Sequence, residues 1–388
     1  MSPSVRGERS ALRRLFAVAF LADFQMYLIY TAMPFKALRL GAGPFELGAL
    51  AAISTGTYAL LVGRFGRLCD RRPRQGLARL ACIGILVGCI GLTAAPELRW
   101  MFLFAPFVGG SMSPFWPSVQ ASIADHAPLA NLERQLGRFN LCWSSGKSCG
   151  FVVGGVLVAA FGAAASLGLA SCIAFTIFFL LPPAAPVRPP ATDARDLHAR
   201  APLFRRLAWA ANAAAFGLGA TLNHHYPRLV QEFGWSPRTF GAFLGLVYLT
   251  QTLAFGALML FPAAWRYRRS ALYVPQLLML VAVLSLPFAG LGRVLVSALV
   301  FGAGLGTCYY SSIYYSLHTL ESRGRNAGVH EGLIGLGSMA VPLIGGAVAR
   351  ELGALWAPYA VAAAAVALSL VLQEALYRTA PRGRAGAL

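Results

Sequence analysis

Charged residues are scarce in this chain, and acidic residues are the scarcest of them. Only 12% of the 388 residues are charged and only 14 are Asp or Glu, whereas a soluble globular protein carries about 25% charged residues. Hydrophobic residues make up 57% of the chain, and the mean hydropathy is +0.62. This composition excludes an ordinary soluble protein and predicts a membrane protein.

Cysteines are few, and none lies where a disulfide would form. All seven fall in apolar runs or in segments expected on the cytoplasmic side, so we expect no disulfides. No pair of cysteines has the spacing of a zinc site, and we predict no metal and no cofactor. The chain also lacks a Gly-rich Walker loop and a visible nucleophile–base arrangement, which argues against ATP-driven transport and against an enzyme.

Long apolar runs are abundant and predict an all-α membrane protein. A spanning helix needs about 20 apolar residues, and the chain offers twelve such runs, so we expect twelve transmembrane helices. They are predicted at residues 15–35, 46–65, 76–95, 100–122, 137–160, 163–183, 206–227, 238–262, 271–291, 293–316, 327–349 and 355–376.

The net charge of +19 could indicate a nucleic-acid partner, but the placement of the basic residues argues against one. With the N-terminus inside, 25 of the 33 Lys and Arg residues lie in cytoplasmic segments, 7 in outer loops and Lys147 within a span. This asymmetry follows the positive-inside rule. We therefore expect a multi-pass protein of the cell inner membrane, with both termini cytoplasmic and no nucleic-acid partner.

A proline-rich polar stretch divides the chain into two halves. Five prolines lie between residues 182 and 190, and a polar segment follows them; this composition is typical of a linker. We predict an N-terminal six-helix bundle at residues 1–182, a cytoplasmic linker at 183–205 and a C-terminal six-helix bundle at 206–388. A shift of 194 residues superimposes weakly similar sequences of the two halves, which predicts that they are pseudo-symmetric.

A short basic segment between the second and third spans resembles a loop of major facilitator superfamily transporters. That loop has the pattern G-x-x-x-D-R-x-G-R-R/K, and this chain matches it at four positions and departs from it at Pro73 and Gln75. The resemblance implies twelve helices in two halves that operate by alternating access. It also implies that Asp70 latches the loop to the start of the eleventh helix, with Arg138 as a plausible partner. The matching residues are Gly66, Asp70, Arg71 and Arg74.

The fifth and eleventh spans carry glycine patterns similar to the G-x-x-x-G-P-x-x-G-G pattern of major facilitator antiporters. Small residues four apart allow helices to pack closely, and proline permits a bend. The resemblance favours antiport, and ordinary close packing is the alternative. The residues concerned are Gly146, Gly150, Gly154, Gly155, Pro342, Gly345 and Gly346.

Ionisable residues within the spans are the main functional candidates, because each costs roughly 3 kcal/mol near the bilayer centre. We hypothesise that Asp23 and Lys147 face a central cavity and pair when it is empty; a purely structural ion pair is the alternative. Glu331, expected at the start of the eleventh span, is either a proton or gate residue or a partner of the helix dipole. We expect His224 and His225 to lie at the membrane–water interface, near the outer end of the seventh span.

Aromatic and hydroxyl side chains gather in the tenth span and at the equivalent place in the fourth. By resemblance, these two helices flank the cavity, and such side chains suit a partly polar organic substrate. The main candidates are Trp116, Gln120, Tyr309, Tyr310 and Tyr314, and further polar candidates are Asn140, Trp143, Asn212, Gln251 and Gln276.

These features predict a secondary transporter of a small organic solute, by proton-coupled efflux antiport. Proton-coupled uptake of a sugar or metabolite is one alternative, and a non-transporting membrane receptor or scaffold is an alternative of another class. The arginine that superfamily antiporters often carry in the fourth helix is replaced by Pro106, so Lys147 is the candidate substitute. We expect a monomer whose partners are its substrate, protons and the lipid bilayer.

Overall fold

The structure, a computed structural model, describes residues 3–69, 71–126, 132–183, 200–288, 290–317 and 323–380. Within these ranges the chain forms twelve α-helices and one short 3-10 helix. The first six helices are α1 (Pro3–Arg39), α2 (Pro44–Cys69), α3 (Arg74–Ala94), α4 (Leu98–His126), α5 (Leu132–Phe161) and α6 (Ala163–Leu180). The others are α7 (Ala201–Glu232), α8 (Pro237–Leu260), η2 (Pro262–Ala264), α9 (Arg269–Ser285), α10 (Leu291–Leu317), α11 (Arg323–Leu352) and α12 (Ala357–Thr379).

Nine of the helices in the described ranges are long and apolar enough to cross a membrane. The remaining three differ for visible reasons. Helix α9 is apolar but has only 17 residues, α4 contains three prolines, and α7 buries polar side chains such as Asn223 and His224 inside the protein. A helix enclosed by other helices need not be apolar on every face. The all-α membrane fold expected from the sequence is confirmed.

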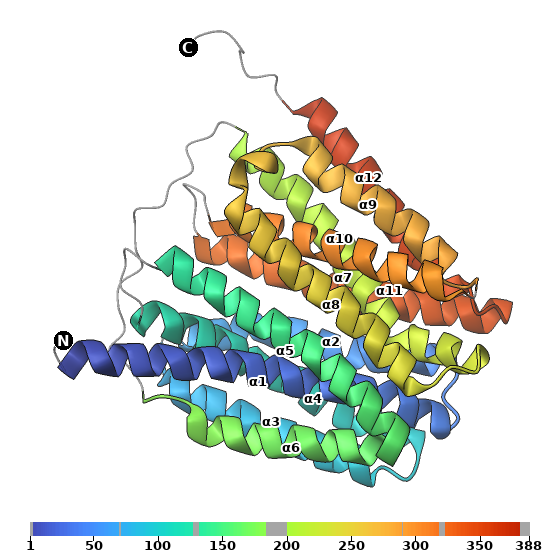
Figure 1. Cartoon of the computed structure of the whole chain (residues 1–388), viewed down its shortest axis with the longest axis horizontal. Helices are drawn as coiled ribbons and strands as arrows, with labels where there is room; N and C mark the ends of the chain where they lie inside the picture. The colour runs from blue at the N-terminus through green and yellow to red at the C-terminus, as the bar shows by residue number, and fades with distance from the viewer. Residues whose placement is uncertain are drawn as a thin grey trace.

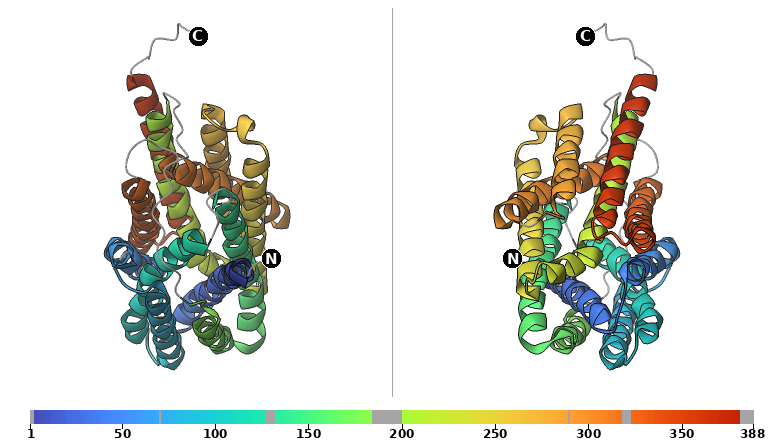
Figure 2. Two further views of the ribbon diagram at one scale, coloured as in Figure 1. Left: turned by 90° about the vertical axis from the view of Figure 1, so that its left-hand side faces the viewer. Right: turned by 90° about the vertical axis from the view of Figure 1, so that its right-hand side faces the viewer.

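The helices form two groups, α1–α6 and α7–α12, which lie side by side (Figure 1). The start of α1 and the end of α12 lie at one end of the molecule, which we call the terminal end; the turns at 71–73 and 261–268 lie there too. The opposite, distal end carries the turns at 40–43, 233–236 and 353–356. In Figure 1 the two groups converge at the distal end and diverge toward the terminal end, and Figure 2 shows them along the helices from both ends.

The connection between the two groups lies largely outside the described residues. The linker was expected at residues 183–205, of which 184–199 are not described. Helix α7 already begins at Ala201, five residues before the expected boundary at 206. The limits of the two halves therefore stay a prediction.

Glycines of α5 bring this helix into direct contact with α1. A Cβ atom on Gly146 would collide with the carbonyl oxygen of Phe20, and one on Gly150 would lie 2.6 Å from the carbonyl oxygen of Phe24. The two helices run in the same direction, so this register places Lys147 within about one helical turn of Asp23 in depth. The glycine spacing thus determines where the two intramembrane charges lie.

The other small residues of the two glycine patterns also lie at close helix contacts. Gly154 packs on Thr31 of α1, and Gly345 packs on Pro358 of α12. A Cβ atom on Gly346 would collide with the carbonyl oxygen of Pro44 at the start of α2. Pro342 lies inside α11, where its backbone meets α2 at Gly48.

The two groups of helices meet at the distal end through α5 and α8. A Cβ atom on Gly155 would lie 2.8 Å from the Cα atom of Gly241 and 2.7 Å from the carbonyl oxygen of Pro237. The rings of Phe35 and Phe240 pack edge to face beside this contact, with centroids 5.4 Å apart. Only glycine allows so close an approach of two backbones, so the distal contact depends on both glycines.

Gly146→Val is expected to destabilise the protein, because the added side chain must push α1 away from α5. Overpacking of this kind costs about 1–3 kcal/mol. The matched control is Gly168→Val on α6, where an added Cβ atom has no neighbour within 4 Å. The melting temperature of the purified protein in detergent should fall for Gly146→Val and stay closer to wild type for Gly168→Val. Equal melting temperatures for the two variants would contradict the described contact.

Candidate functional site

A cavity of about 190 Å³ lies between the two groups of helices. Residues of α1, α2, α4 and α5 line one side of it, and residues of α7, α8, α10 and α11 line the other. A site at the interface of two halves is where a transporter with repeated halves binds its substrate. Eight of the candidate residues named from the sequence line this cavity: Asp23, Trp116, Gln120, Trp143, Lys147, Gln251, Tyr309 and Glu331.

Aromatic rings hold the ammonium group of Lys147, a side chain that is only 4% exposed. Its Nζ atom lies 4.0 Å from the ring centroid of Tyr248 and 4.6 Å from that of Tyr27. The rings of Phe216 and Trp143 follow at 5.8 and 5.9 Å. Each such contact stabilises a cation by about 0.5–2 kcal/mol. Since Tyr27 belongs to α1 and Tyr248 to α8, the lysine joins the two groups of helices.

Asp23 lines the same cavity and is 7% exposed. Among the described residues, neither its carboxylate nor the Lys147 ammonium has a hydrogen-bond or ion-pair partner at contact distance. The expected direct pairing of these two residues is therefore absent from this structure. Its physical reason is that the lysine side chain extends onto the faces of Tyr27 and Tyr248. The two charges both face the cavity and interact electrostatically without forming a contact ion pair.

Glu331 links the two groups of helices through a single hydrogen bond. The hydroxyl of Tyr58 on α2 donates to its Oε2 atom across 2.9 Å. The expectation that Glu331 opens the eleventh helix is wrong, because α11 begins eight residues earlier at Arg323. The helix dipole acts mainly within the first turn, so it does not explain a carboxylate at this position.

His330, the neighbour of Glu331, faces the interior of the second group and is fully buried. Its Nδ1 atom lies 2.8 Å from the Oγ atom of Ser312 and 3.4 Å from the Nδ2 atom of Asn212. Its ring packs edge to face on Tyr309, with centroids 5.1 Å apart. His330 therefore packs against Tyr309 without lining the cavity itself.

His224 and His225 are buried, which corrects the expectation that they are interfacial. His224 lines the cavity and packs against the ring of Tyr30 at 5.8 Å. The Nε2 atom of His225 lies 2.9 Å from the carbonyl oxygen of Pro342. The sequence placed the end of this span at residue 227, whereas α7 continues to Glu232, so both histidines lie deeper than expected.

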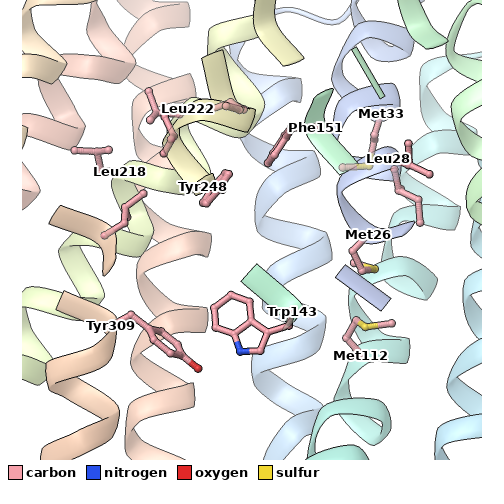
Figure 3. Close-up of a cluster of buried hydrophobic side chains, with 14 of the residues drawn as sticks. Met26, Leu28, Met33, Met112, Trp143, Phe151, Leu218, Leu222, Tyr248 and Tyr309 are labelled. Carbon is pink, nitrogen blue, oxygen red and sulfur yellow. The ribbon is translucent and has the colours of Figure 1, made fainter. Parts of the chain in front are cut away.

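Of the tyrosines predicted in the tenth span, only Tyr309 lines the cavity. Tyr310 and Tyr314 pack against Trp265 instead, with ring centroids 5.7 and 5.0 Å apart. Tyr310 and Tyr314 are four residues apart and therefore share one face of α10. Tyr309 directly precedes Tyr310 and so points about 100° away from that face. Figure 3 shows Tyr309 and Trp143 reaching toward each other, with their centroids 5.4 Å apart.

The predicted gating loop is described only in part, because Asp70 lies outside the described residues. Arg74 forms an ion pair with Asp125 of α4. This pair joins α3 to α4 within one group of helices. The latch stays a prediction. Of the remaining loop candidates, Arg71 and Arg138 are exposed, and Gly66 has open space where a Cβ atom would stand.

Several residues that complete the site were not predicted from the sequence. Tyr27 lies four residues after Asp23 and therefore on the same face of α1, a spacing that could have identified it. Phe216 and Tyr248 gave no such signal, since aromatic residues are common in apolar spans. The lining residues that were not candidates include Tyr27, Tyr30, Tyr58, Phe216, Asn223, His224 and Tyr248.

Solved structures with the same architecture belong to transporters. A bacterial homolog of the human lysosomal transporter Spinster, in an inward-facing and occupied conformation, has a TM-score of 0.70 at 18% identity and covers 97% of both chains. A POT family transporter in complex with a thioalcohol-conjugated peptide has a TM-score of 0.74 at 13% identity, covering 95% of this chain and 96% of that one. The nucleoside transporter NupG has a TM-score of 0.70 at 13% identity, covering 95% and 98%. At these low identities, the TM-scores show a common fold and nothing more.

Sequence comparison adds a distant relative and a family. The human solute carrier family 67 member A1 is 28% identical over 163 residues, which make up 41% of this chain and 38% of that protein. The match thus spans well under half of the relative's length. The model of the Major Facilitator Superfamily matches residues 15–329. The chain therefore belongs to the Major Facilitator Superfamily of membrane transporters.

Proposed function

We propose that this protein is a proton-coupled efflux antiporter of a small organic solute. One observation carries the proposal: the cavity between the two groups of helices holds the carboxylate of Asp23 and the ammonium of Lys147, and neither forms a hydrogen bond or contact ion pair with a described residue. Burying an ionisable group costs roughly 3 kcal/mol on insertion scales. The cost of keeping two such groups at one cavity is explained if solute or protons bind to them there.

Asp23 is the proposed proton carrier. A proton entering from the outer side binds to its carboxylate, and the donor group of a solute arriving from the cytoplasm takes the place of that proton. One carboxylate oxygen cannot serve both at once, so solute and proton exchange. The other titratable groups that line the cavity are Tyr27, Tyr30, Tyr58, Lys147, His224, Tyr248, Tyr309 and Glu331.

Alternating access is proposed to move two rigid halves, residues 1–182 and 206–388, about the cavity. The terminal end faces the cytoplasm in this proposal, in keeping with the basic residues near it. The distal contact of Gly155 with Gly241 closes the outer side, and the Tyr58–Glu331 hydrogen bond is broken or remade as the halves move. An inward-facing conformation is also the one reported for the bacterial Spinster homolog.

Asp23→Asn is expected to uncouple transport from protons. The amide keeps the shape of the side chain but binds no proton. Solute exchange therefore continues, at a lower rate because the donor group of the solute loses the carboxylate, while accumulation driven by a pH gradient falls at least tenfold further, which is about 1.4 kcal/mol. The measurement follows four labelled single-ring probes in proteoliposomes: phenylalanine, phenethylamine, 3-phenylpropionate and phenethyl alcohol.

The control for this variant is Glu97→Gln, which neutralises an exposed acid at the distal end and should transport like wild type. Normal gradient-driven accumulation by Asp23→Asn would refute the assignment of the proton to this residue. Wild-type accumulation in the same direction as the protons would favour the uptake alternative. Movement of neither solute nor protons would favour a receptor or scaffold.

A further inference from the structure

The charges of the cavity define a substrate class. We infer that the solute is a small zwitterion with one ring, whose anionic group binds the ammonium of Lys147 and whose cationic group binds the carboxylate of Asp23. This inference rests on the proposed function, since it names what the same cavity carries. It follows from three features of the site: the free donors of the lysine, the free acceptors of the aspartate and the size of the cavity.

Lys147 has hydrogen-bond donors that no described residue accepts. An ammonium group carries three donors and no acceptor, and the nearest groups to its Nζ atom are the ring faces of Tyr248 and Tyr27 at 4.0 and 4.6 Å. Ring faces attract a cation but do not replace an anionic hydrogen-bond acceptor. The side chain lines the cavity, so an anionic group in the cavity can reach it.

Asp23 has hydrogen-bond acceptors to which no described residue donates. An ionised carboxylate only accepts hydrogen bonds, and no described residue donates one to Asp23. The second carboxylate of the cavity differs, because Glu331 already accepts a hydrogen bond from Tyr58 at 2.9 Å. Asp23 is therefore the acid available to a cationic donor group of the solute.

The nearness of the two opposite charges excludes solutes with a single charge as good ligands. The helix register places Asp23 and Lys147 at similar depth, and both line one cavity. A lone anion bound at Lys147 would be repelled by Asp23, and a lone cation bound at Asp23 would be repelled by Lys147. A zwitterion satisfies both groups and leaves no charge unpaired.

The size and lining of the cavity suit a solute with about one ring. A volume of about 190 Å³ is somewhat larger than the roughly 150 Å³ cavity that holds benzene in an engineered protein. It is smaller than the roughly 300–1,000 Å³ of sites for drug-sized ligands. Trp143 and Tyr309 both line the cavity, and their rings pack edge to face with centroids 5.4 Å apart (Figure 3). They offer aromatic surface to such a solute.

Equilibrium binding of the four single-ring probes to the purified full chain tests this inference. Phenylalanine carries both charges, phenethylamine lacks the carboxylate, 3-phenylpropionate lacks the ammonium, and phenethyl alcohol carries no charge. Phenylalanine should bind at least tenfold more tightly than each of the others, because a charge-assisted hydrogen bond contributes about that factor. Asp23→Asn should remove its advantage over 3-phenylpropionate, and Lys147→Met should remove its advantage over phenethylamine.

Several results would overturn the inference. These are equal binding of a singly charged or neutral probe by the wild type, no binding of any probe, and an equal loss for all probes in both variants. Loss of the zwitterion preference in Glu331→Gln but not in Asp23→Asn would show that the cationic group binds elsewhere. Where a single variant does not fold, the double variant Asp23→Asn/Lys147→Met, which removes both of these charges together, should bind phenylalanine no more than a few-fold more tightly than any other probe. A retained preference for phenylalanine would refute the inference.

The binding assay separates this inference from the proposed function. If phenylalanine is preferred but no proton moves in proteoliposomes, the zwitterion site stands and antiport fails. If protons exchange for phenethylamine or phenethyl alcohol while phenylalanine neither binds nor moves, antiport stands and the zwitterion site fails.

Discussion

Lys147→Met is expected to lower solute exchange at least tenfold. The change removes the ammonium that lies between Tyr27 and Tyr248 and leaves Asp23 as a buried charge without a compensating cation. Removing one partner of a buried charge pair costs about 3–5 kcal/mol when the two are in contact. Asp23 and Lys147 are not in contact, so we expect a smaller loss, of at least 1.4 kcal/mol, which corresponds to a tenfold lower solute exchange. Exchange of labelled phenylalanine by equal amounts of folded protein in proteoliposomes measures the effect.

The chain supplies a matched control for this variant. Of its 33 basic residues only Lys36 and Lys147 are lysines. Lys36 lies at the distal end, where its Nζ atom donates to the carbonyl oxygen of Thr93 at 2.7 Å, and Lys36→Met should exchange solute like wild type. Lys147→Arg should not restore full activity, because a planar guanidinium is larger than a compact ammonium and places its hydrogen-bond donors differently. Normal exchange by Lys147→Met would remove this residue from the site.

Gly241→Val is expected to shift the protein toward a conformation whose distal end is open. In the present structure a Cβ atom on Gly241 would lie 2.8 Å from the Cα atom of Gly155 on the opposite group of helices. Overpacking costs about 1–3 kcal/mol, which changes an equilibrium by about 5- to 150-fold. The cost applies only while the distal ends are together, so the variant favours the state in which they separate.

The reactivity of a cysteine in the cavity reports this shift. Asn223→Cys, placed in a background without the seven native cysteines, is labelled by a membrane-impermeant maleimide added on the distal side. Labelling should be several-fold faster with Gly241→Val than without it. Gly256→Val is the control on the same helix, because no atom lies within 4 Å of an added Cβ atom there. Equal labelling rates with Gly241→Val and Gly256→Val would show that the distal glycine contact does not hold this end closed.

Composition and the long apolar runs were sufficient to predict the all-α membrane fold. Long apolar runs have few solutions in a bilayer, because backbone polar groups must be satisfied within the chain. The same physics identified Asp23 and Lys147, since an ionisable side chain within a span must face the protein interior or a cavity. Both residues line the cavity in the structure.

Side-chain direction could not be predicted from span positions. Tyr309 and Tyr310 are neighbours in the sequence, yet only Tyr309 lines the cavity, because the rotation of α10 about its axis decides which face is turned inward. The ends of spans were also uncertain: α7 extends to Glu232, which places His224 at the cavity instead of the interface. The lysine shows a third limit, because its depth was predictable and its preference for two tyrosine rings over Asp23 was not.

The most direct test of this account measures solute and proton movement together in liposomes that contain only this protein. The solute is the single-ring probe that the wild type binds most tightly, and an internal dye reports the pH. The account predicts that solute leaving on one side is accompanied by protons moving the opposite way, and that Asp23→Asn abolishes the proton movement while solute exchange continues. Solute and protons moving in the same direction, or solute movement without protons in the wild type, would contradict it.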